Sequence, residues 1–259
     1  MSVASRFVVC LLAGAGLLIA LRPAELHGQD QTATQPHAPA PRNVIVLDPG
    51  HGGTDPGADL GNKVAEKDVT LALATKLRAA LAAQDFNVIL TREADATVAV
   101  TADQRAQIAN RSRALACVSL HATRSGSGIH IYTSALEPVS DTPDTGFVPM
   151  RWDTVQQRFV AQSAQLAADL KSAFAAASLP ADVRTATVPP LDSLMCPAVA
   201  VEFAPIENVA NAGKGAEAAS YQDAAVKAIA AALGKWRADT TPQPAAPPTS
   251  AAPATKDAQ

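Results

Sequence analysis

Short apolar runs alternate with longer amphipathic stretches through the middle of the chain. The apolar runs predict β-strands at residues 43–48, 86–91, 117–122, 128–133, 183–188 and 198–203. Several runs, such as "VIVL" and "AVAV", contain no polar position, which is typical of strands covered on both faces. The pattern therefore predicts strands that lie inside a layered domain.

The amphipathic stretches between these strands predict helices. Residues 68–84 repeat apolar side chains at i, i+4 spacing, and Thr101 with Gln104 forms a capping-box pattern that opens a second helix. Two further helices are expected over residues 154–177 and about 217–237. The side chains expected to face inward are Val69, Leu73, Leu77 and Leu81; Val155, Phe159, Leu166, Leu170 and Phe174; and Val226, Ile229, Leu233 and Trp236.

The strand–helix alternation predicts the fold class. It indicates an α/β protein with a single three-layer domain over residues 43–237, in which a mainly parallel sheet of about six strands carries helices on both faces. Because parallel strands place their carboxyl ends on one edge, any site is expected at that edge.

The segments on either side of this domain have a different composition. Residues 1–28 resemble a secretory signal peptide, with Arg6 ahead of an apolar stretch from Phe7 to Leu21 that includes Cys10. Residues 29–42 form a Pro-rich linker, and residues 238–259 form a Pro/Ala-rich disordered tail. We expect a periplasmic or secreted protein with no membrane span after signal cleavage. No clean small-x-small pair precedes Gln29, so an uncleaved anchor stays an open alternative.

Composition narrows the class of protein. The chain is 48% apolar, which suffices for a sizeable core, and its net charge of −3 provides no basic stripe of the kind that nucleic-acid binding requires. After export Cys117 and Cys196 remain, and an oxidising compartment would allow them to pair. Because both lie beside buried strands, we expect two unpaired core thiols.

Four ionisable side chains are expected at the carboxyl edge of the sheet. His51 follows the first strand within "DPGHGGTDPGA", His121 ends the strand in "VSLHA", Glu202 ends the strand in "VAVEF", and Glu66 precedes the first helix. Two histidines and a carboxylate form a common catalytic zinc set, and a further carboxylate nearby can act as the general base. These residues predict a Zn²⁺ hydrolase.

Each of these residues also has a simpler interpretation. A histidine at a strand end is often a hydrogen-bonded loop residue, and Glu66 could be a carboxylate that the helix dipole favours. Glu202 follows an apolar run, so its charge needs a cation or a wet cleft. His130 is interpreted as a packed or surface residue. Arg92 and Arg105 are interpreted as structural.

The ordered blocks "VIVLDPGHGGTDPGA", "EKDVTLALATKLRAAL", "VILTREAD", "RAQIAN", "VSLHA" and "CPAVAVEFAPIEN" resemble the zinc-dependent N-acetylmuramoyl-L-alanine amidases of bacterial cell walls. The resemblance covers residues 43–237. It implies that His51, Glu66 and His121 bind zinc, that Glu202 is the catalytic base, and that the substrate is peptidoglycan. The implied reaction hydrolyses the amide between N-acetylmuramic acid and L-alanine during wall remodelling or daughter-cell separation. An activator protein of unknown identity is a further expected partner.

The sequence departs from the family pattern around the cleft. Thr123 replaces the asparagine that usually follows "SLHA", and Ala204 and Pro205 replace a glycine and an aromatic residue. Residues 134–153 have no helical period. Two alternative functions stay open: a catalytically weak or inactive peptidoglycan-binding protein of the same fold, and a zinc exopeptidase.

Overall fold

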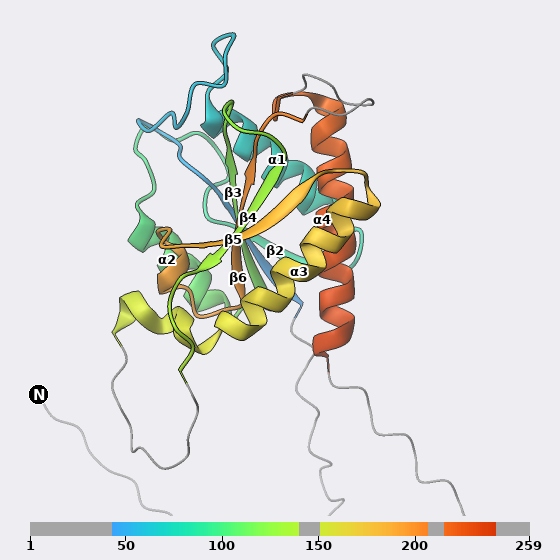
Figure 1. Cartoon of the computed structure of the whole chain (residues 1–259). Helices are drawn as coiled ribbons and strands as arrows, with labels where there is room; N and C mark the ends of the chain where they lie inside the picture. Colours follow the sequence, from blue (N-terminus) through green and yellow to red (C-terminus); the bar gives the residue numbers. More distant parts are fainter. Residues whose placement is uncertain (1–42, 140–150, 207–214, 242–259) are drawn as a thin grey trace, which may run out of the picture. The chain divides into compact units, whose positions relative to one another are not determined.

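The computed structural model describes residues 43–139, 151–206 and 215–241 (Figure 1). The chain divides into two units, Met1–Pro39 and Ala40–Gln259, and all described residues belong to the second. The predicted signal peptide and linker lie outside the described residues, as does the tail from residue 242 onward, so these boundaries stay predictions. In the described part of the chain, no helix is both long and apolar enough for a bilayer crossing.

The described domain contains a six-stranded sheet in the order β2-β1-β3-β6-β4-β5. All neighbouring pairs are parallel except β4 and β6, which run antiparallel. The mainly parallel α/β fold is therefore confirmed. The strands are β1 (Val44–Pro49), β2 (Asn87–Leu90), β3 (Ala116–Ala122), β4 (Ile129–Ser134), β5 (Ala181–Ala186) and β6 (Ala198–Phe203).

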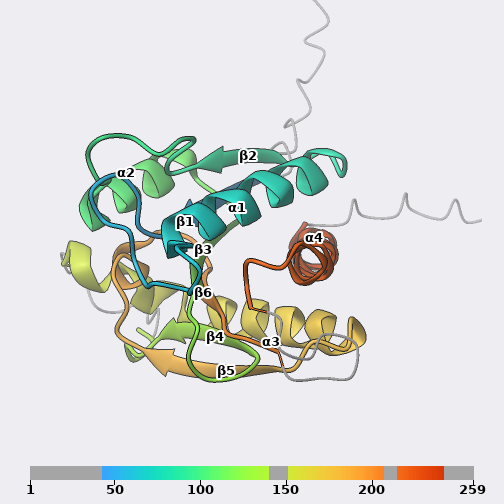
Figure 2. The same ribbon diagram turned by 90° about the horizontal axis from the view of Figure 1, so that it is seen from above.

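Helices cover both faces of the sheet, as expected. Figure 2 shows α1 (Glu66–Ala82), α3 (Val160–Ala176) and α4 (Ala219–Thr240) on one face and α2 (Ala102–Ser112) on the other. The larger apolar cluster joins the sheet to α1, α3 and α4. The smaller cluster joins it to α2 and to the short 3₁₀ helix η2 (Leu191–Ser193).

The amphipathic pattern was a reliable guide to most helices. In α1 and α4 every side chain predicted to face inward is buried, and Thr101 caps α2 through the predicted capping box with Gln104. Helix α4 extends to Thr240, three residues past the predicted end of the domain at 237.

The predicted helix at 154–177 is divided in the structure. Its first part is a 3₁₀ helix, η1 (Trp152–Arg158), and α3 begins at Val160. As a result Val155 and Phe159 are only half-buried, whereas Gln156 is buried in their place. The Gln156 amide donates to the carbonyls of Leu194 and Cys196, a contact that no apolar period predicts.

The expectation of two unpaired thiols was wrong. Cys117 and Cys196 form a disulfide, with 6.2 Å between their Cα atoms. Cys117 pairs in register with Ala198 on β6, and Cys196 lies two residues before Ala198. Strand order, which local sequence does not reveal, brings the two sulfurs together.

We predict that replacing both cysteines by alanine lowers the free energy of unfolding by about 2–5 kcal/mol, because the bridge closes a long loop of the unfolded chain. Guanidinium denaturation of the chain without residues 1–28 measures this change. A reductant should lower the stability of the parent protein to that of the variant and leave the variant unchanged. A parent protein insensitive to reductant would contradict the prediction.

Candidate functional site

The sheet brings the four predicted site residues to one edge. His51 follows β1, and His121 is the next-to-last residue of β3. Glu202 lies near the end of β6, directly opposite His121 in the parallel ladder. Glu66 is the first residue of α1, whose amino end reaches the same edge. The predicted clustering is therefore what the structure shows.

The loop after β1 needs glycine because it passes very close to the two histidines. A Cβ atom at Gly50 would lie 2.5 Å from Cε1 of His121. At Gly57, where φ is +66°, a Cβ atom would lie 2.7 Å from both the Glu66 carboxylate and the His51 ring. His51 itself has a φ of 61°, in the left-handed region. The loop backbone thus packs closely against both imidazole rings and leaves little room for either ring to move.

Two buried arginines hold the carbonyls of this loop. Arg105 donates to the carbonyls of Pro49 (2.8 Å) and His51 (2.6 Å), and it forms an ion pair of 2.6 Å with the buried Asp48. This carboxylate partner agrees with the structural role expected for Arg105. The loop conformation around His51 is therefore fixed by a guanidinium group from α2.

Arg92 supports the same loop from the other side. Its Nε donates to the carbonyl of Pro49 and one Nη to that of Gly50, both at 3.0 Å. The same Nη also donates to the carbonyl of Lys67 and the hydroxyl of Thr70, so it links the loop to α1. Burial and the nearby positive charge of Arg105 lower the pKa of Arg92. The expected structural role of Arg92 agrees with these contacts.

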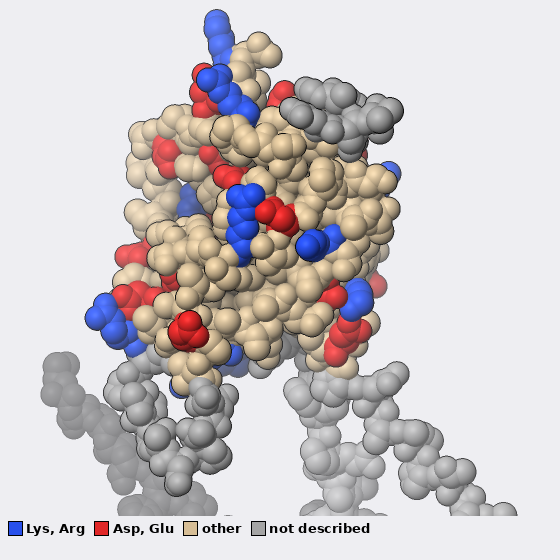
Figure 3. Space-filling model, viewed as in Figure 1, with Lys and Arg blue, Asp and Glu red and all other residues tan. Residues whose placement is uncertain are grey.

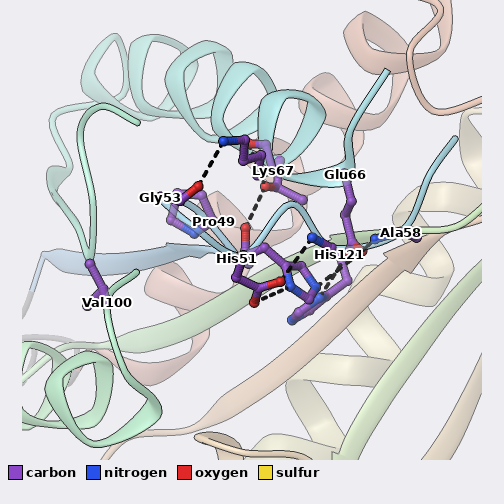
Figure 4. A network of polar contacts seen from close by, with 12 residues as sticks. Pro49, His51, Gly53, Ala58, Glu66, Lys67, Val100 and His121 are labelled. Atoms are coloured by element: carbon purple, nitrogen blue, oxygen red, sulfur yellow. Dashed lines mark hydrogen bonds and ion pairs between the residues drawn. The ribbon is translucent and has the colours of Figure 1, made fainter. Parts of the chain in front are cut away.

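Glu66 is the buried centre of the site (Figure 4). One carboxylate oxygen lies 3.1 Å from Nε2 of His51 and accepts the backbone N–H of Ala58 at 2.9 Å. The other lies 3.0 Å from Nδ1 of His121 and accepts the N–H of Ala122 at 3.0 Å. Four partners therefore fix the plane of this carboxylate.

These contacts explain the electrostatics of the site. Burial is the largest single effect on Glu66 and opposes its ionisation, but the hydrogen bonds from His121, His51 and the two backbone N–H groups outweigh it. The pKa of Glu66 consequently lies far below its usual range. The hydrogen bond to Glu66 raises the pKa of His51, against burial, and Asp55 adds to this effect.

The donor set fits a divalent metal ion. His51, Glu66 and His121 each offer one ligand atom, and these atoms lie within 4.8 Å of one another. The other ring nitrogen of His51 contacts Asp55 at 2.8 Å, as in metal sites where a carboxylate orients the ligand imidazole. Two nitrogens and a carboxylate oxygen are ligands that Zn²⁺ prefers.

Glu202 lies outside this three-residue group but beside it. Its register partner on β3 is His121, so the two side chains extend from the same face of the sheet. The hydroxyl of Tyr132 on β4 donates to Oε2 of Glu202 at 3.2 Å. Sequence reasoning did not single out Tyr132, because the pairing of β4 with β6 is not visible in the pattern.

His130 is more closely tied to the site than expected. It is buried, its Nδ1 lies 2.5 Å from Asp182 of β5, and its register partner on β6 is Glu202. The row His121, Glu202, His130 and Asp182 therefore crosses four neighbouring strands on one face. The prediction that His130 is a packed residue is confirmed, but its position beside Glu202 was not expected.

Ala204 and Pro205, which differ from the usual residues of the family pattern, form backbone hydrogen bonds with the loop after β3. The carbonyl of Pro205 accepts the N–H of Gly128, and the N–H of Ala204 donates to the carbonyl of Gly128. Thr123 donates its N–H to Phe203 and contacts the hydroxyl of Ser125. These positions join the end of β6 to the loop between β3 and β4.

The sequence model of the N-acetylmuramoyl-L-alanine amidase family matches residues 45–235. The chain belongs to this family. The matched range runs from the second residue of β1 to the last turns of α4, and it contains all four predicted site residues.

Individual members of the amidase family are similar over shorter stretches. The germination-specific N-acetylmuramoyl-L-alanine amidase of Bacillus subtilis is 40% identical over 95 residues, which are 32% of this chain and 40% of the relative. The probable amidase AmiB of Haemophilus influenzae is 42% identical over 86 residues, 32% of this chain and 19% of the relative. The aligned stretches thus span less than half of these relatives.

The fold itself matches a solved amidase domain. The catalytic domain of the amidase CwlV from Bacillus (Paenibacillus) polymyxa var. colistinus superposes with a TM-score of 0.57 at 24% identity. The match covers 75% of this chain and 97% of that domain. At this level of identity the match shows that the two domains share a fold.

We predict that Gly50→Ala weakens zinc binding by about 10–100-fold, the usual scale for disturbing the groups that orient a ligand. The new methyl group would lie 2.7 Å from Nδ1 of His121 and displace the ring. Competition with a chelating dye measures the affinity. Gly234→Ala is the control, because this glycine lies in α4 and a Cβ atom there meets only the movable end of the Gln84 side chain. Equal zinc affinity in both variants would contradict the prediction.

Proposed function

We propose that this chain is a zinc-dependent N-acetylmuramoyl-L-alanine amidase that hydrolyses the amide between N-acetylmuramic acid and L-alanine in peptidoglycan. One observation carries the proposal. A metal-capable group of two histidines and a buried carboxylate lies beside an independent glutamate, in register on the next strand. Family membership supports the choice of substrate.

The residues at the edge would divide the chemistry between them. His51 through Nε2, His121 through Nδ1 and the Glu66 carboxylate would hold Zn²⁺. A zinc ion bound there supplies a Lewis acid that polarises the scissile carbonyl and acidifies a water molecule. Asp55 and the N–H groups of Ala58 and Ala122 keep the ligands oriented.

Glu202 would move the proton. Its carboxylate lies on the strand next to His121, so it can accept a proton from the attacking water and return it to the departing amine of L-alanine. An amine leaves readily only when protonated, so one carboxylate serves both steps. Tyr132 donates to one oxygen of Glu202 and so leaves the other oxygen for the proton.

The location follows from the same set of observations. The signal-like sequence of residues 1–28 favours export, and the disulfide between Cys117 and Cys196 fits an oxidising compartment. We therefore place the protein in the periplasm or outside the cell, where peptidoglycan is accessible.

We predict different effects for a ligand and for the base. His51→Ala should lose zinc and activity together, because it removes one of three protein ligands. Glu202→Gln keeps the size of the side chain but cannot accept a proton. It should retain about one zinc per chain and still bind cell wall, while hydrolysis falls about 10²–10⁴-fold. Metal analysis and mass spectrometry of released muropeptides measure both quantities.

The same experiment separates the alternatives. Loss of zinc in Glu202→Gln would make Glu202 a ligand, and full activity would exclude it as the base. Peptides released with intact glycan strands identify the amidase. Cleavage only within the peptide identifies an exopeptidase, and zinc-independent wall binding without release identifies a binding protein.

We also predict that Tyr132→Phe lowers kcat about ten-fold or more with little change in KM, because a hydrogen bond to a charged group is lost. Zinc content should stay unchanged. In a Glu202→Gln background the same substitution should have almost no further effect, since the group that Tyr132 orients is already absent. Additive losses in the double variant would show that Tyr132 acts elsewhere.

A further inference from the structure

The face of the sheet that carries Glu202 continues outward across β4 and β5. Register partners and alternate residues along a strand extend from the same face, so Tyr132 and its partner Arg184 lie one row below His130 and Asp182. Arg184 lies on β5, the outermost strand, and its side chain is 47% exposed. This part of the face therefore combines polar side chains with access from solvent.

Polar side chains connect this edge to Glu202. Arg184 donates through Nε to Asp182 at 2.7 Å, and it is the register partner of Tyr132 on β4, so the two side chains lie next to each other on the same face. Tyr132 in turn donates to Glu202. Burial and the charge of Glu202 raise the pKa of Tyr132, while Arg184 opposes the rise. Arg184 is thus the positive end of a polar chain that finishes at the proposed base.

Arg184 keeps unused hydrogen-bond donors on this face. Each oxygen of Asp182 already has a partner: Oδ1 contacts His130, and Oδ2 accepts from Arg184. A guanidinium has five N–H donors, and only part of this set is used here. Asp182 therefore holds the arginine in place, and the free donors suit a planar anion such as a carboxylate.

The position of Arg184 fits a peptide that extends from the reaction centre. Arg184 lies two strands away from Glu202 across the sheet, a separation of about 10 Å. Along the strands, it is displaced from Glu202 by about one row of side chains. An extended peptide covers about 3.3 Å per residue. A peptide that runs from Glu202 toward β5 would therefore bring a group one to three residues beyond the cleaved amide within reach of the long Arg184 side chain. Figure 3 shows Lys and Arg side chains in small separate groups beside Asp and Glu on this face, with no continuous basic patch.

We infer that Arg184, held by Asp182 and lying beside Tyr132, forms a subsite that binds a carboxylate of the stem peptide next to the reaction centre. This inference rests on the proposed function for the identity of the peptide. The subsite distinguishes stem peptides that carry a free carboxylate near L-alanine from those in which that group is amidated.

Calorimetric titration tests the subsite without requiring catalysis. The probes are two synthetic stem peptides that differ only in whether the residue after L-alanine carries a carboxylate or its amide. Arg184→Gln should weaken binding of the acidic peptide about ten-fold or more and leave the amidated peptide unchanged. The matched control is Arg151→Gln, which removes another exposed arginine paired with an aspartate two residues away, Asp153.

A second variant guards against a purely structural effect. Asp182→Asn keeps the size of the side chain and one oxygen that can accept from Arg184, so it should retain the preference for the acidic peptide over the amidated one. Equal losses for both peptides in Arg184→Gln, or no binding of either peptide by the parent protein, would overturn the subsite. Amide hydrolysis is measured separately, so failure of the amidase reaction with preserved charge discrimination would overturn only the proposed function.

Discussion

The buried carboxylate of Glu66 is the constraint on which the candidate site depends. It contacts two histidines and two backbone N–H groups that come from the loop after β1 and from β3, while Glu66 itself begins α1. Burying an ionised group is costly unless it is paired and hydrogen-bonded or coordinates a metal. The strands and the first helix must therefore pack correctly before the carboxylate is satisfied, which couples formation of the site to formation of the domain.

The loop that carries His51 is held from a different direction. Arg92 and Arg105 are buried, and between them they donate to three successive carbonyls, those of Pro49, Gly50 and His51. The Gly50 carbonyl also accepts from the hydroxyl of Thr70, and a buried carbonyl that lost its donors would carry a substantial cost. The left-handed conformation of His51 thus rests on side chains from outside the loop, and its imidazole stays oriented by fixed neighbours rather than by the loop alone.

The sequence was sufficient for those parts of the site that depend on where strands end. His51, His121 and Glu202 follow or close apolar runs, so their common edge could be predicted from strand–helix alternation. The pairing of Cys117 with Cys196 and the approach of Tyr132 to Glu202 depend on which strands are neighbours, and apolar periodicity contains no such information. Gln156 illustrates a third case, because a buried amide that satisfies two carbonyls interrupts the period of a helix.

Because β4 runs antiparallel to β6, the edge of the sheet that carries the candidate site has two parts, formed by strands of opposite direction. Strands β1, β3 and β6 contribute their ends, whereas β4 and β5 run the opposite way and contribute their beginnings. The residues that would bind metal and activate water belong to the first part, and those that would meet the peptide beyond L-alanine belong to the second. Substitutions in β5 can therefore alter ligand preference during evolution while the residues proposed for the chemistry, including Tyr132 on β4, are inherited unchanged.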